Sequence, residues 1–273
     1  MERCVGGKGV NAARAFRRLG GRPVVVGFLD SWCVESLRSE GIEVKAQSEP
    51  YEVRTAVSVV DCAERSVTEL VEEAHPATAS ALKEATEAAL SCGRKSSFLC
   101  LSGSLPQGCP PDTYRRILEA CPQAETIVDA RGEPLRLSLA AGPFAIKPNR
   151  EELGDLFGKT AESKSELLTQ ARQVKKLGAR NVVVTCGPEG VLAVLDEGAW
   201  FFHAPQVEPV NTTGCGDALL GALVFRLMQG VDMLQALRFA VAAASASACT
   251  ALPGDLAPGL TSRLAEKVVL TTL

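Results

Sequence analysis

Short apolar runs alternate with helix-like stretches along most of the 273 residues, and this alternation constrains the fold more than any other feature of the sequence. Short apolar strands that are separated by helices pack into a parallel sheet covered on both faces. We therefore predict an α/β fold with a mostly parallel central sheet. Strands are expected near residues 24–26, 98–101, 126–128, 144–146 and 182–184, and helices near 11–19, 79–90, 112–120, 165–177 and 232–250.

One stretch, residues 43–70, breaks the alternation. It is rich in β-branched residues over 53–60 and 66–70, with no helix pattern between these two runs. We predict a β lid insertion over 43–70, carried on a core formed by residues 1–42 and 71–273. A small sheet beside an active site can exclude water from the reaction. The alternative is an edge hairpin without a function.

Composition and charge exclude several classes of protein. With 46% hydrophobic residues, the chain can bury a large core. Lys and Arg number 29 against 32 Asp and Glu, and the basic residues are spread along the chain, so no nucleic-acid partner is expected. No apolar run approaches the roughly 18 residues of a membrane span, and the first residues lack a signal-peptide pattern. We therefore expect a cytoplasmic protein with no membrane partner.

Ten cysteines and two histidines, His75 and His203, limit the metal and redox chemistry of the chain. No two cysteines form a Cys-x-x-Cys pair, and neither histidine has ligand spacing from a cysteine or from the other histidine. We expect no zinc site and no histidine-based triad. Most cysteines are expected to be small buried thiols. Cys215 has two interpretations: a reactive thiol with a lowered pKa at a helix start, or a small residue tolerated in a turn.

Residues 211–218, Asn-Thr-Thr-Gly-Cys-Gly-Asp-Ala, place an anion site next to a carboxylate. Gly214 and Gly216 allow a tight turn before an apolar helix, so backbone N–H groups and the positive end of the helix dipole would face a phosphate. Asp217 could then accept a proton from an attacking hydroxyl. The alternative is a glycine-rich turn whose aspartate only caps the helix.

Three other segments have turn compositions. Residues 6–14 form a glycine turn that leads into a helix, with Lys8 and Asn11 near its start, but without the spacing of a Walker A loop. Residues 102–106 follow a predicted strand and could bring backbone groups to a ligand. Residues 185–190 are expected to join two strands in a tight turn.

Asn149 and Glu152 follow the strand predicted at 144–146 and begin a helix. One interpretation is a capping box, in which each side chain bonds to the backbone of the other residue. The functional interpretation is that the two residues, one helical turn apart, hold the hydration shell of a Mg²⁺ ion that accompanies nucleotide phosphates.

These segments, in this order, resemble the ribokinase-like sugar kinases and, among them, the phosphofructokinase B type. The resemblance extends from Gly6 to about Pro258. It implies a three-layer α/β/α sandwich with a small β lid. The matching segments are Gly-Gly-Lys-Gly-Val-Asn-Ala-Ala-Arg, Ser-Gly-Ser-Leu-Pro-Gln-Gly, Val-Asp-Ala-Arg-Gly-Glu, Lys-Pro-Asn-Arg-Glu-Glu-Leu and Asn-Thr-Thr-Gly-Cys-Gly-Asp-Ala.

The resemblance implies a kinase that moves the γ-phosphoryl group of ATP, with Mg²⁺, to a hydroxyl of a ketohexose phosphate. Members that act on fructose 1-phosphate or tagatose 6-phosphate are the most similar in appearance. By this resemblance the catalytic base is Asp217, and Gly214, Cys215 and Gly216 form the anion hole. The resemblance assigns nucleotide binding to Lys147, Asn149, Glu152, Thr185 and Gly187, with the helix around 243–247, and Mg²⁺ binding through water to Asn149 and Glu152. It assigns substrate binding to Gly7, Lys8, Asn11 and Arg54.

Arg54 lies in the predicted lid and matches an arginine that holds the phosphate already on the sugar. A guanidinium can bind phosphate through two parallel hydrogen bonds, so Arg54 favours a phosphosugar over a free sugar. The resemblance also allows a homodimer that forms through the lid.

The chain departs from the resemblance on the sugar side. Related kinases usually have a first core strand before the Gly-Gly-Lys-Gly segment, whereas only five residues precede Gly6 here. We therefore expect the N-terminal strand to be missing from the sheet. Two alternatives to the phosphosugar kinase stay open: a kinase of an unphosphorylated sugar or nucleoside, and a truncated, non-catalytic protein that binds nucleotide.

Overall fold

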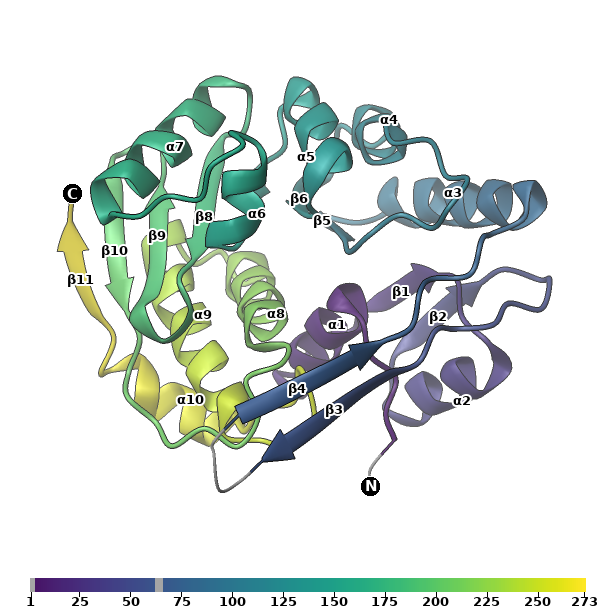
Figure 1. The fold of residues 1–273 in the computed structure, drawn as a ribbon, viewed down its shortest axis with the longest axis horizontal. Helices are drawn as coiled ribbons and strands as arrows, with labels where there is room; N and C mark the ends of the chain where they lie inside the picture. The colour runs from purple at the N-terminus through teal and green to yellow at the C-terminus, as the bar shows by residue number, and fades with distance from the viewer. Residues whose placement is uncertain (1–2, 62–65) are drawn as a thin grey trace.

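The computed structural model describes residues 3–61 and 66–273, and a seven-stranded sheet forms its centre (Figure 1). The strands lie in the order β11-β10-β9-β8-β7-β6-β5. All strands except β9 and β11 run in the same direction, which confirms the predicted α/β class and mostly parallel sheet. The strands are β5 (Phe98–Ser102), β6 (Glu125–Asp129), β7 (Ala145–Ile146), β8 (Asn181–Thr185), β9 (Gly190–Val194), β10 (Ala199–His203) and β11 (Val269–Thr272).

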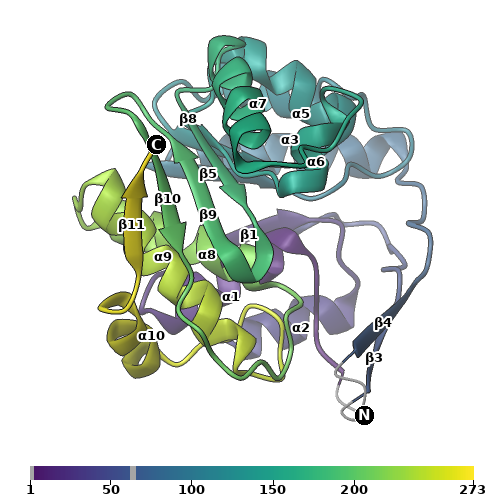
Figure 2. The same cartoon turned by 60° about the vertical axis from the view of Figure 1, so that its left-hand side comes forward.

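Helices cover both faces of this sheet (Figures 1 and 2). One layer contains α1 (Lys8–Arg18), α8 (Cys215–Met228), α9 (Met233–Ala248) and α10 (Pro258–Ala265). The other contains α3 (Ala79–Gly93), α4 (Thr113–Ala120), α5 (Gly132–Ser138), α6 (Arg150–Asp155) and α7 (Lys164–Lys176), with the short 3₁₀ turns Leu139–Ala141 and Gly187–Glu189 beside the sheet. The five predicted helices are confirmed as α1, α3, α4, α7 and α9, whereas α2, α5 and α10 were not predicted.

Alternating residues of the central strands belong to the two different helix layers. Ile127 and Ala145 pack in one core cluster with residues of α1, α8 and α9, whereas Val128 and Ile146 pack in another with residues of α4, α5 and α7. Because side chains alternate along a strand, this division shows that the sheet is buried on both faces. The resulting layers are those of a ribokinase-like sandwich.

The strand predicted near residues 24–26 is present, but it does not belong to the central sheet. β1 (Val24–Gly27) pairs in parallel with β2 (Glu43–Ala46) in a separate two-stranded sheet, packed with α2 (Ser31–Ser39). Val24 is 43% exposed, so the prediction of burial on both faces is wrong for this strand. The reason is that β1 belongs to a separate two-stranded sheet and not to the central sheet, whose two faces are covered by helices.

The prediction that most cysteines are buried is also wrong for the described residues. Of nine described cysteines, only Cys33, Cys121 and Cys186 are buried. Cys100 is exposed because it lies on β5, the edge strand of the central sheet. Cys62 lies outside the described residues.

A hairpin projects from the body of the molecule (Figures 1 and 2). Its strands are β3 (Ala56–Asp61) and β4 (Ser66–Val71), which pair antiparallel. Of the insertion predicted over 43–70, the first part therefore lies in β2 beside β1, and the hairpin begins later. Whether the hairpin acts as a lid stays a prediction.

No helix among the described residues is both long enough and apolar enough to cross a membrane.

Candidate active site

Helices α1 and α8 pack in direct backbone contact, and this contact sets the geometry of the site. A Cβ atom on Gly221 of α8 would lie only 2.3 Å from the carbonyl oxygen of Ala12 in α1. Such a short distance is sterically impossible, so glycine is required for this approach. The consequence is that Asn11 of α1 reaches Asp217 of α8, and its Nδ2 donates a hydrogen bond of 2.8 Å to Asp217 Oδ2.

The predicted glycine turn is present at the start of α8. Gly214 has φ +79°, the left-handed conformation that favours glycine, and a Cβ there would lie 3.0 Å from the nitrogen of Gly254. Cys215 and Gly216 begin α8, where N–H groups lack partners within the helix; Cys215 N has only Thr212 O, at 3.4 Å, as a backbone acceptor among the described residues. A Cβ on Gly216 would lie 3.5 Å from Lys147 Nζ, so the Lys147 ammonium lies beside the start of α8. This arrangement suits an anion.

The Cys215 thiol does not have the lowered pKa of the reactive interpretation. Burial, together with the nearby Asp217 carboxylate, raises the pKa of Cys215 to about 12. The thiol therefore stays protonated, and the structure favours a small residue accommodated in the turn.

Four charged side chains form a network beside the turn. Lys8 Nζ lies 2.9 Å from Asp129 Oδ1 and 2.7 Å from Glu152 Oε1, and Lys147 Nζ lies 3.0 Å from Asp129 Oδ2. The last contact is an ion pair without hydrogen-bond alignment, because Oδ2 is buried with no donor in line. Asp129 is completely buried and Lys147 is 3% exposed, so these charges interact with little screening by water.

The environment of Asp217 suits a general base. Burial raises its pKa from 3.8 to about 6, and the Asp129 carboxylate acts in the same direction. Lys147, Lys8 and the hydrogen bond from Asn11 oppose this shift. A carboxylate with this pKa is ionised at neutral pH and is a stronger base than an ordinary aspartate.

Lys8 is held as a cation in this network. Burial lowers its pKa, but the Asp129 and Glu152 carboxylates outweigh this effect and raise the pKa above its ordinary value. At neutral pH the ammonium is therefore fully charged and placed between two acidic residues, beside the start of α8.

Asn149 and Glu152 form the capping box that was one of their two interpretations. Glu152 N donates to Asn149 Oδ1 at 2.7 Å, and Asn149 N donates to Glu152 Oε2 at 2.9 Å. No group of three or more His, Cys, Asp or Glu residues suited to direct metal ligation exists among the described residues. Each carboxylate oxygen of Glu152 still has a lone pair for a water molecule. The pair therefore fits a Mg²⁺ ion that keeps its water shell and is held mainly by nucleotide phosphates.

The residues predicted on the nucleotide side lie at neighbouring strand ends. Thr185 ends β8 and forms a bridge with Asn149, and Thr185 N donates to Pro148 O at 3.0 Å. Gly187 follows with φ +57° and begins a 3₁₀ turn. Residues 243–247 of α9 were also predicted to line the nucleotide pocket, but Ala243 and Ser247 are buried.

The residues predicted on the substrate side divide into two groups. Gly7, with φ +110°, caps α1 and places Lys8 and Asn11 in the network. Arg54 is exposed in the segment before β3, and no hydrogen bond or ion pair between described residues joins it to the network. The hairpin does reach the glycine turn, because Thr213 Oγ1 and Glu69 Oε1 of β4 are 3.1 Å apart.

Two functional candidates were missed in the sequence. Asp129 ends β6 and joins Lys8 to Lys147, and Arg14 of α1 is 2% exposed with Glu40 as its ionic partner. The signal for Asp129 was a carboxylate at the end of an apolar strand, in the Val-Asp-Ala-Arg segment. Arg14 gave a weaker signal, an arginine on the otherwise apolar side of the first helix.

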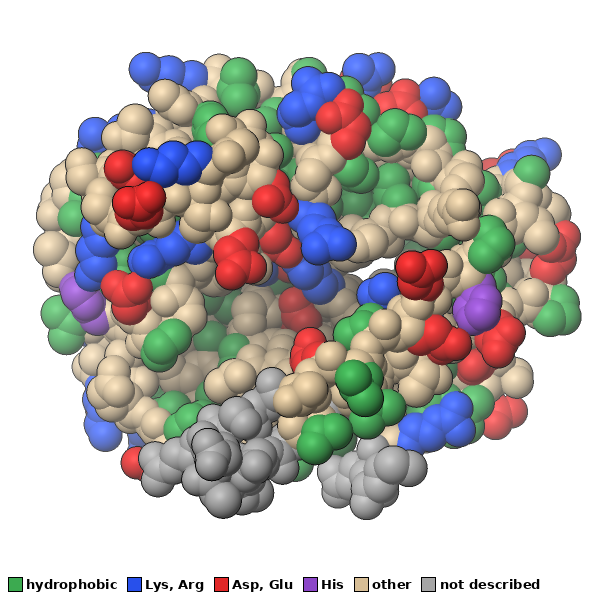
Figure 3. Space-filling view, in the orientation of Figure 1, with side chains coloured by type: hydrophobic (Ala, Val, Ile, Leu, Met, Phe, Trp, Pro, Cys, Tyr) green, Lys and Arg blue, Asp and Glu red, His purple; other side chains and the backbone are tan. Residues whose placement is uncertain are grey.

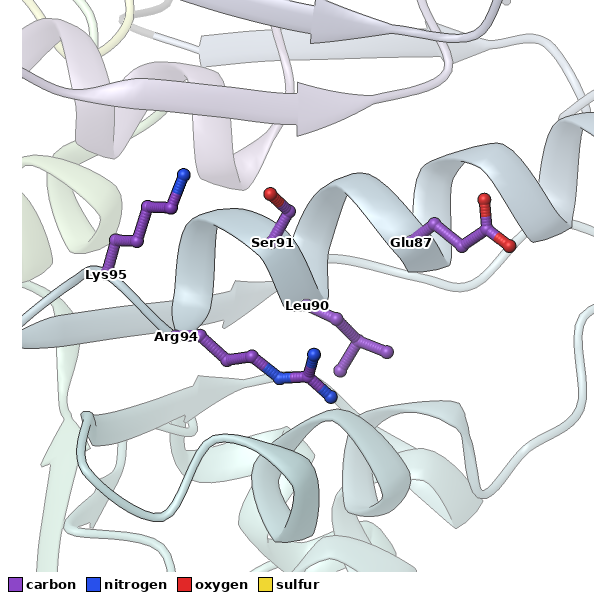
Figure 4. A pocket seen from close by; sticks show the side chains of 5 residues that line it. All are labelled: Glu87, Leu90, Ser91, Arg94 and Lys95. Atoms are coloured by element: carbon purple, nitrogen blue, oxygen red, sulfur yellow. The ribbon is translucent and has the colours of Figure 1, made fainter.

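Figure 3 shows acidic and basic side chains around a hollow near the centre of one face. Two further hollows lie in the half of the molecule around α3, α4 and α5. One is lined by residues 104–106, part of the 102–106 segment that was predicted to follow a strand, and by Arg131 and Gly132. The other lies along α3, where Lys95 and Arg94 extend in different directions (Figure 4). None of the predicted site residues lines either of them.

The layers, the glycine turn at a helix start and the buried Asp217 carboxylate are those expected of the ribokinase-like class. The chain belongs to the pfkB family of carbohydrate kinases, which it matches over residues 1–258. It is therefore a sugar kinase.

Relatives and solved structures agree with this assignment. The chain is 30% identical to a 1-phosphofructokinase of Borreliella burgdorferi, over 92% of this chain and 82% of the relative. It is 32% identical to a D-tagatose-1-phosphate kinase of Klebsiella oxytoca, over 93% and 85%. The crystal structure of phosphofructokinase-2 from Escherichia coli in complex with potassium is 27% identical, with a TM-score of 0.88, and the match covers 96% of this chain and 87% of that chain.

Proposed function

We propose that this protein transfers the γ-phosphoryl group of ATP to a hydroxyl of a ketohexose phosphate. The observation that carries the proposal is the position of Asp217, a buried carboxylate with a pKa of about 6 in the first turn of α8, directly after Gly214, Cys215 and Gly216. A base next to an anion site is the minimum that phosphoryl transfer to an alcohol requires.

Each residue of the site has a role in this proposal. Asp217 accepts the proton of the sugar hydroxyl as the oxygen attacks phosphorus, and the N–H groups of the glycine turn hold the negative charge of the transferred group. Lys147 contributes a buried positive charge close to Gly216. Mg²⁺ would neutralise the nucleotide phosphates, and Asn149 and Glu152 would hold its water shell.

The substrate proposal depends on the relatives and on Arg54. Two of the relatives named above are a 1-phosphofructokinase and a D-tagatose-1-phosphate kinase, which favours fructose 1-phosphate or tagatose 1-phosphate over the tagatose 6-phosphate predicted earlier as one option. Arg54 is exposed beside the hairpin, and no other described residue forms a hydrogen bond or ion pair with it. We place it as the phosphate ligand in the substrate complex, once the hairpin has closed on the sugar.

A substrate panel tests this proposal. With ATP and Mg²⁺, we expect turnover of fructose 1-phosphate, tagatose 1-phosphate, tagatose 6-phosphate or fructose 6-phosphate, and little turnover of fructose, ribose or adenosine. Arg54→Ala should raise KM for the phosphosugar by roughly 30-fold, as for the loss of about 2 kcal/mol from a charge-assisted contact. Arg22→Ala, which removes another exposed arginine before β1, is the control and should leave KM unchanged. Equal turnover of free sugars would support the kinase of unphosphorylated substrates, and no turnover of any of them would support the non-catalytic alternative.

We also propose a second copy of the chain as a partner through the hairpin. Val57 and Leu70 are opposite each other in the β3–β4 pair and are 43% and 63% exposed, and Val59 on the same strand is 53% exposed. An apolar hairpin face of this kind is suited to burial against another protein surface. Sedimentation of Leu70→Lys and of the unaltered protein tests this: a dimer that dissociates in the variant supports it, and a monomer in both contradicts it.

A further inference from the structure

Arg14 is one of the most completely bonded side chains in the molecule. It is 2% exposed. Its Nε and Nη2 donate to Glu40 at 2.6 and 3.0 Å, its Nη2 also donates to Val5 O at 2.8 Å, and its Nη1 donates to Pro253 O at 2.8 Å. The same Nη1 lies 3.4 Å from Asn11 Oδ1. One guanidinium therefore connects α1 to three other segments and to the residue that contacts the proposed base.

The chemistry of these groups fixes the orientation of the Asn11 amide. An arginine can only donate hydrogen bonds, and an ionised carboxylate can only accept them. Asn11 lies between Arg14 on one side and Asp217 on the other. The amide must therefore turn its oxygen to Arg14 and its NH₂ group to Asp217. The reverse orientation would place two donors together and two acceptors together.

Arg14 also fixes the segment that packs against the glycine turn. Pro253, whose carbonyl accepts from Arg14, is followed by Gly254, which lies against Asn11 and Gly214. A Cβ on Gly254 would lie 2.4 Å from Asn11 O, and a Cβ on Gly214 would lie 3.0 Å from the nitrogen of Gly254. A shift of this segment would therefore move Asn11 and the turn together.

We propose that Arg14 is a positioning residue for phosphoryl transfer, which holds Asn11 in the orientation that donates to Asp217. The proposal rests on the function proposed above for its catalytic consequence, but its structural content can be tested without substrate. Since the bond from Asn11 opposes the raised pKa of Asp217, loss of that orientation should raise this pKa further.

Other charged and titratable groups also face Asp217 and have to stay in place in any test. They are Lys147 after β7, Asp129 at the end of β6, Lys8 at the start of α1 and Cys215 in the first turn of α8. None of them contacts Arg14 through a hydrogen bond or ion pair among the described residues. Substitutions at Arg14 therefore reach Asp217 through Asn11 and the 253–254 segment.

The direct experiment measures the ionisation of Asp217 in the protein without ligands, by carboxyl ¹³C NMR as a function of pH. Asn11→Ala should raise the pKa of Asp217 by roughly half to one pH unit, as expected for loss of one hydrogen bond to the charged form. Arg14→Lys should raise it in the same direction, because lysine keeps the charge opposite Glu40 without the fork that reaches Asn11. The double variant should titrate like Asn11→Ala alone.

Two control variants separate positioning from stability. Arg17→Met removes an exposed cation from the last turn of α1, away from the 253–254 segment, and should leave the titration unchanged. Glu40→Gln removes the ionic partner of Arg14 and should lower the melting temperature with little effect on Asp217. If Arg14→Lys lowers the melting temperature but Asp217 titrates as in the unaltered protein, Arg14 is only a scaffold residue and the proposal is wrong. If the titration shifts but no phosphosugar is turned over, the positioning inference stands and the proposed function fails.

Discussion

Lys147 Nζ lies 3.0 Å from Asp129 Oδ2, and both side chains are almost completely removed from solvent. Asp129 is the last residue of β6, and Lys147 directly follows β7, the neighbouring parallel strand. Parallel strands end at the same edge of a sheet, so this ion pair marks the edge where ligands of α/β proteins collect. Asp129 also contacts Lys8, and it therefore balances two cations next to the proposed base.

Asp129→Asn should destabilise the protein and weaken catalysis together. The substitution keeps the shape of the side chain but leaves Lys8 and Lys147 without their shared carboxylate. Breaking one side of a buried ion pair costs about 3 to 5 kcal/mol, which a urea titration would detect. Glu133→Gln, in the exposed pair with Arg136, is the control and should change stability little. A stability equal to that of the control would show that Asp129 does not balance the lysines.

Asp217→Asn should make the unligated protein more stable at pH 8. The folded-state pKa of Asp217, about 6, lies above the ordinary value of 3.8, so ionisation is harder in the folded protein than in the unfolded chain. Ionisation of Asp217 therefore lowers the free energy of unfolding. This effect is absent below pH 4, grows between pH 4 and 6 and is complete above pH 6, where it is at most about 3 kcal/mol. Thermal unfolding at pH 8 and pH 5 tests this. An Asn variant that melts below the unaltered protein at pH 8 would contradict the burial argument.

Glu152→Gln should raise the Mg²⁺ concentration required for half-maximal activity more than it raises KM for the sugar. The reason is that a neutral amide holds the water shell of a cation less strongly than a carboxylate does. The capping bond from Asn149 can be kept by the Gln oxygen, so α6 should remain folded. Glu151→Gln, at the exposed neighbouring position of the same helical turn, is the matched control. Equal Mg²⁺ titrations of the two variants would leave Glu152 with its capping bond and its ion pair with Lys8.

Gly221→Ala should separate α1 from α8 and reduce activity as well as stability. The added methyl group would lie 2.3 Å from Ala12 O, so the helices have to move apart and the bond between Asn11 and Asp217 lengthens. Overpacking of this kind costs typically 1 to 3 kcal/mol. Gly259→Ala in α10 is the control, since its nearest atom would be 3.9 Å away, and it should be neutral or slightly stabilising. Similar activity in both variants would show that the helix contact does not set the site.

The sequence predicts the sheet, five helices and the residues around Asp217 because each of these has a local signal. Glycine turns, helix starts and apolar runs depend on neighbouring residues, and Asp217, Asn11 and Glu152 all occur in such patterns. Asp129 has only the local signal of a carboxylate at the end of an apolar strand. That signal does not show its role, since one of its partners, Lys8, is 121 positions away in the sequence. The place of β1 outside the central sheet could not be predicted either, because an apolar run does not show which strand it pairs with.

Arg54 illustrates a further limit of the sequence. Its position in the β-rich segment is a local property, but the contact with a substrate phosphate that we propose for it would depend on the hairpin closing over the sugar. In the structure it is exposed and separate from the charge network. Its role therefore rests on the substrate panel and on the Arg54→Ala variant.

The most direct test of the account is single-turnover and steady-state phosphoryl transfer by Asp217→Asn, with nucleotide binding measured in parallel. The account predicts that kcat falls by roughly two or more orders of magnitude, as for loss of a positioned general base, while the affinity for ATP changes little. In the unaltered enzyme, kcat is expected to fall as the pH drops below about 6, where Asp217 becomes protonated. The kcat that remains in the variant should not show this fall. Near-normal turnover in this variant would remove Asp217 from the mechanism and contradict the account.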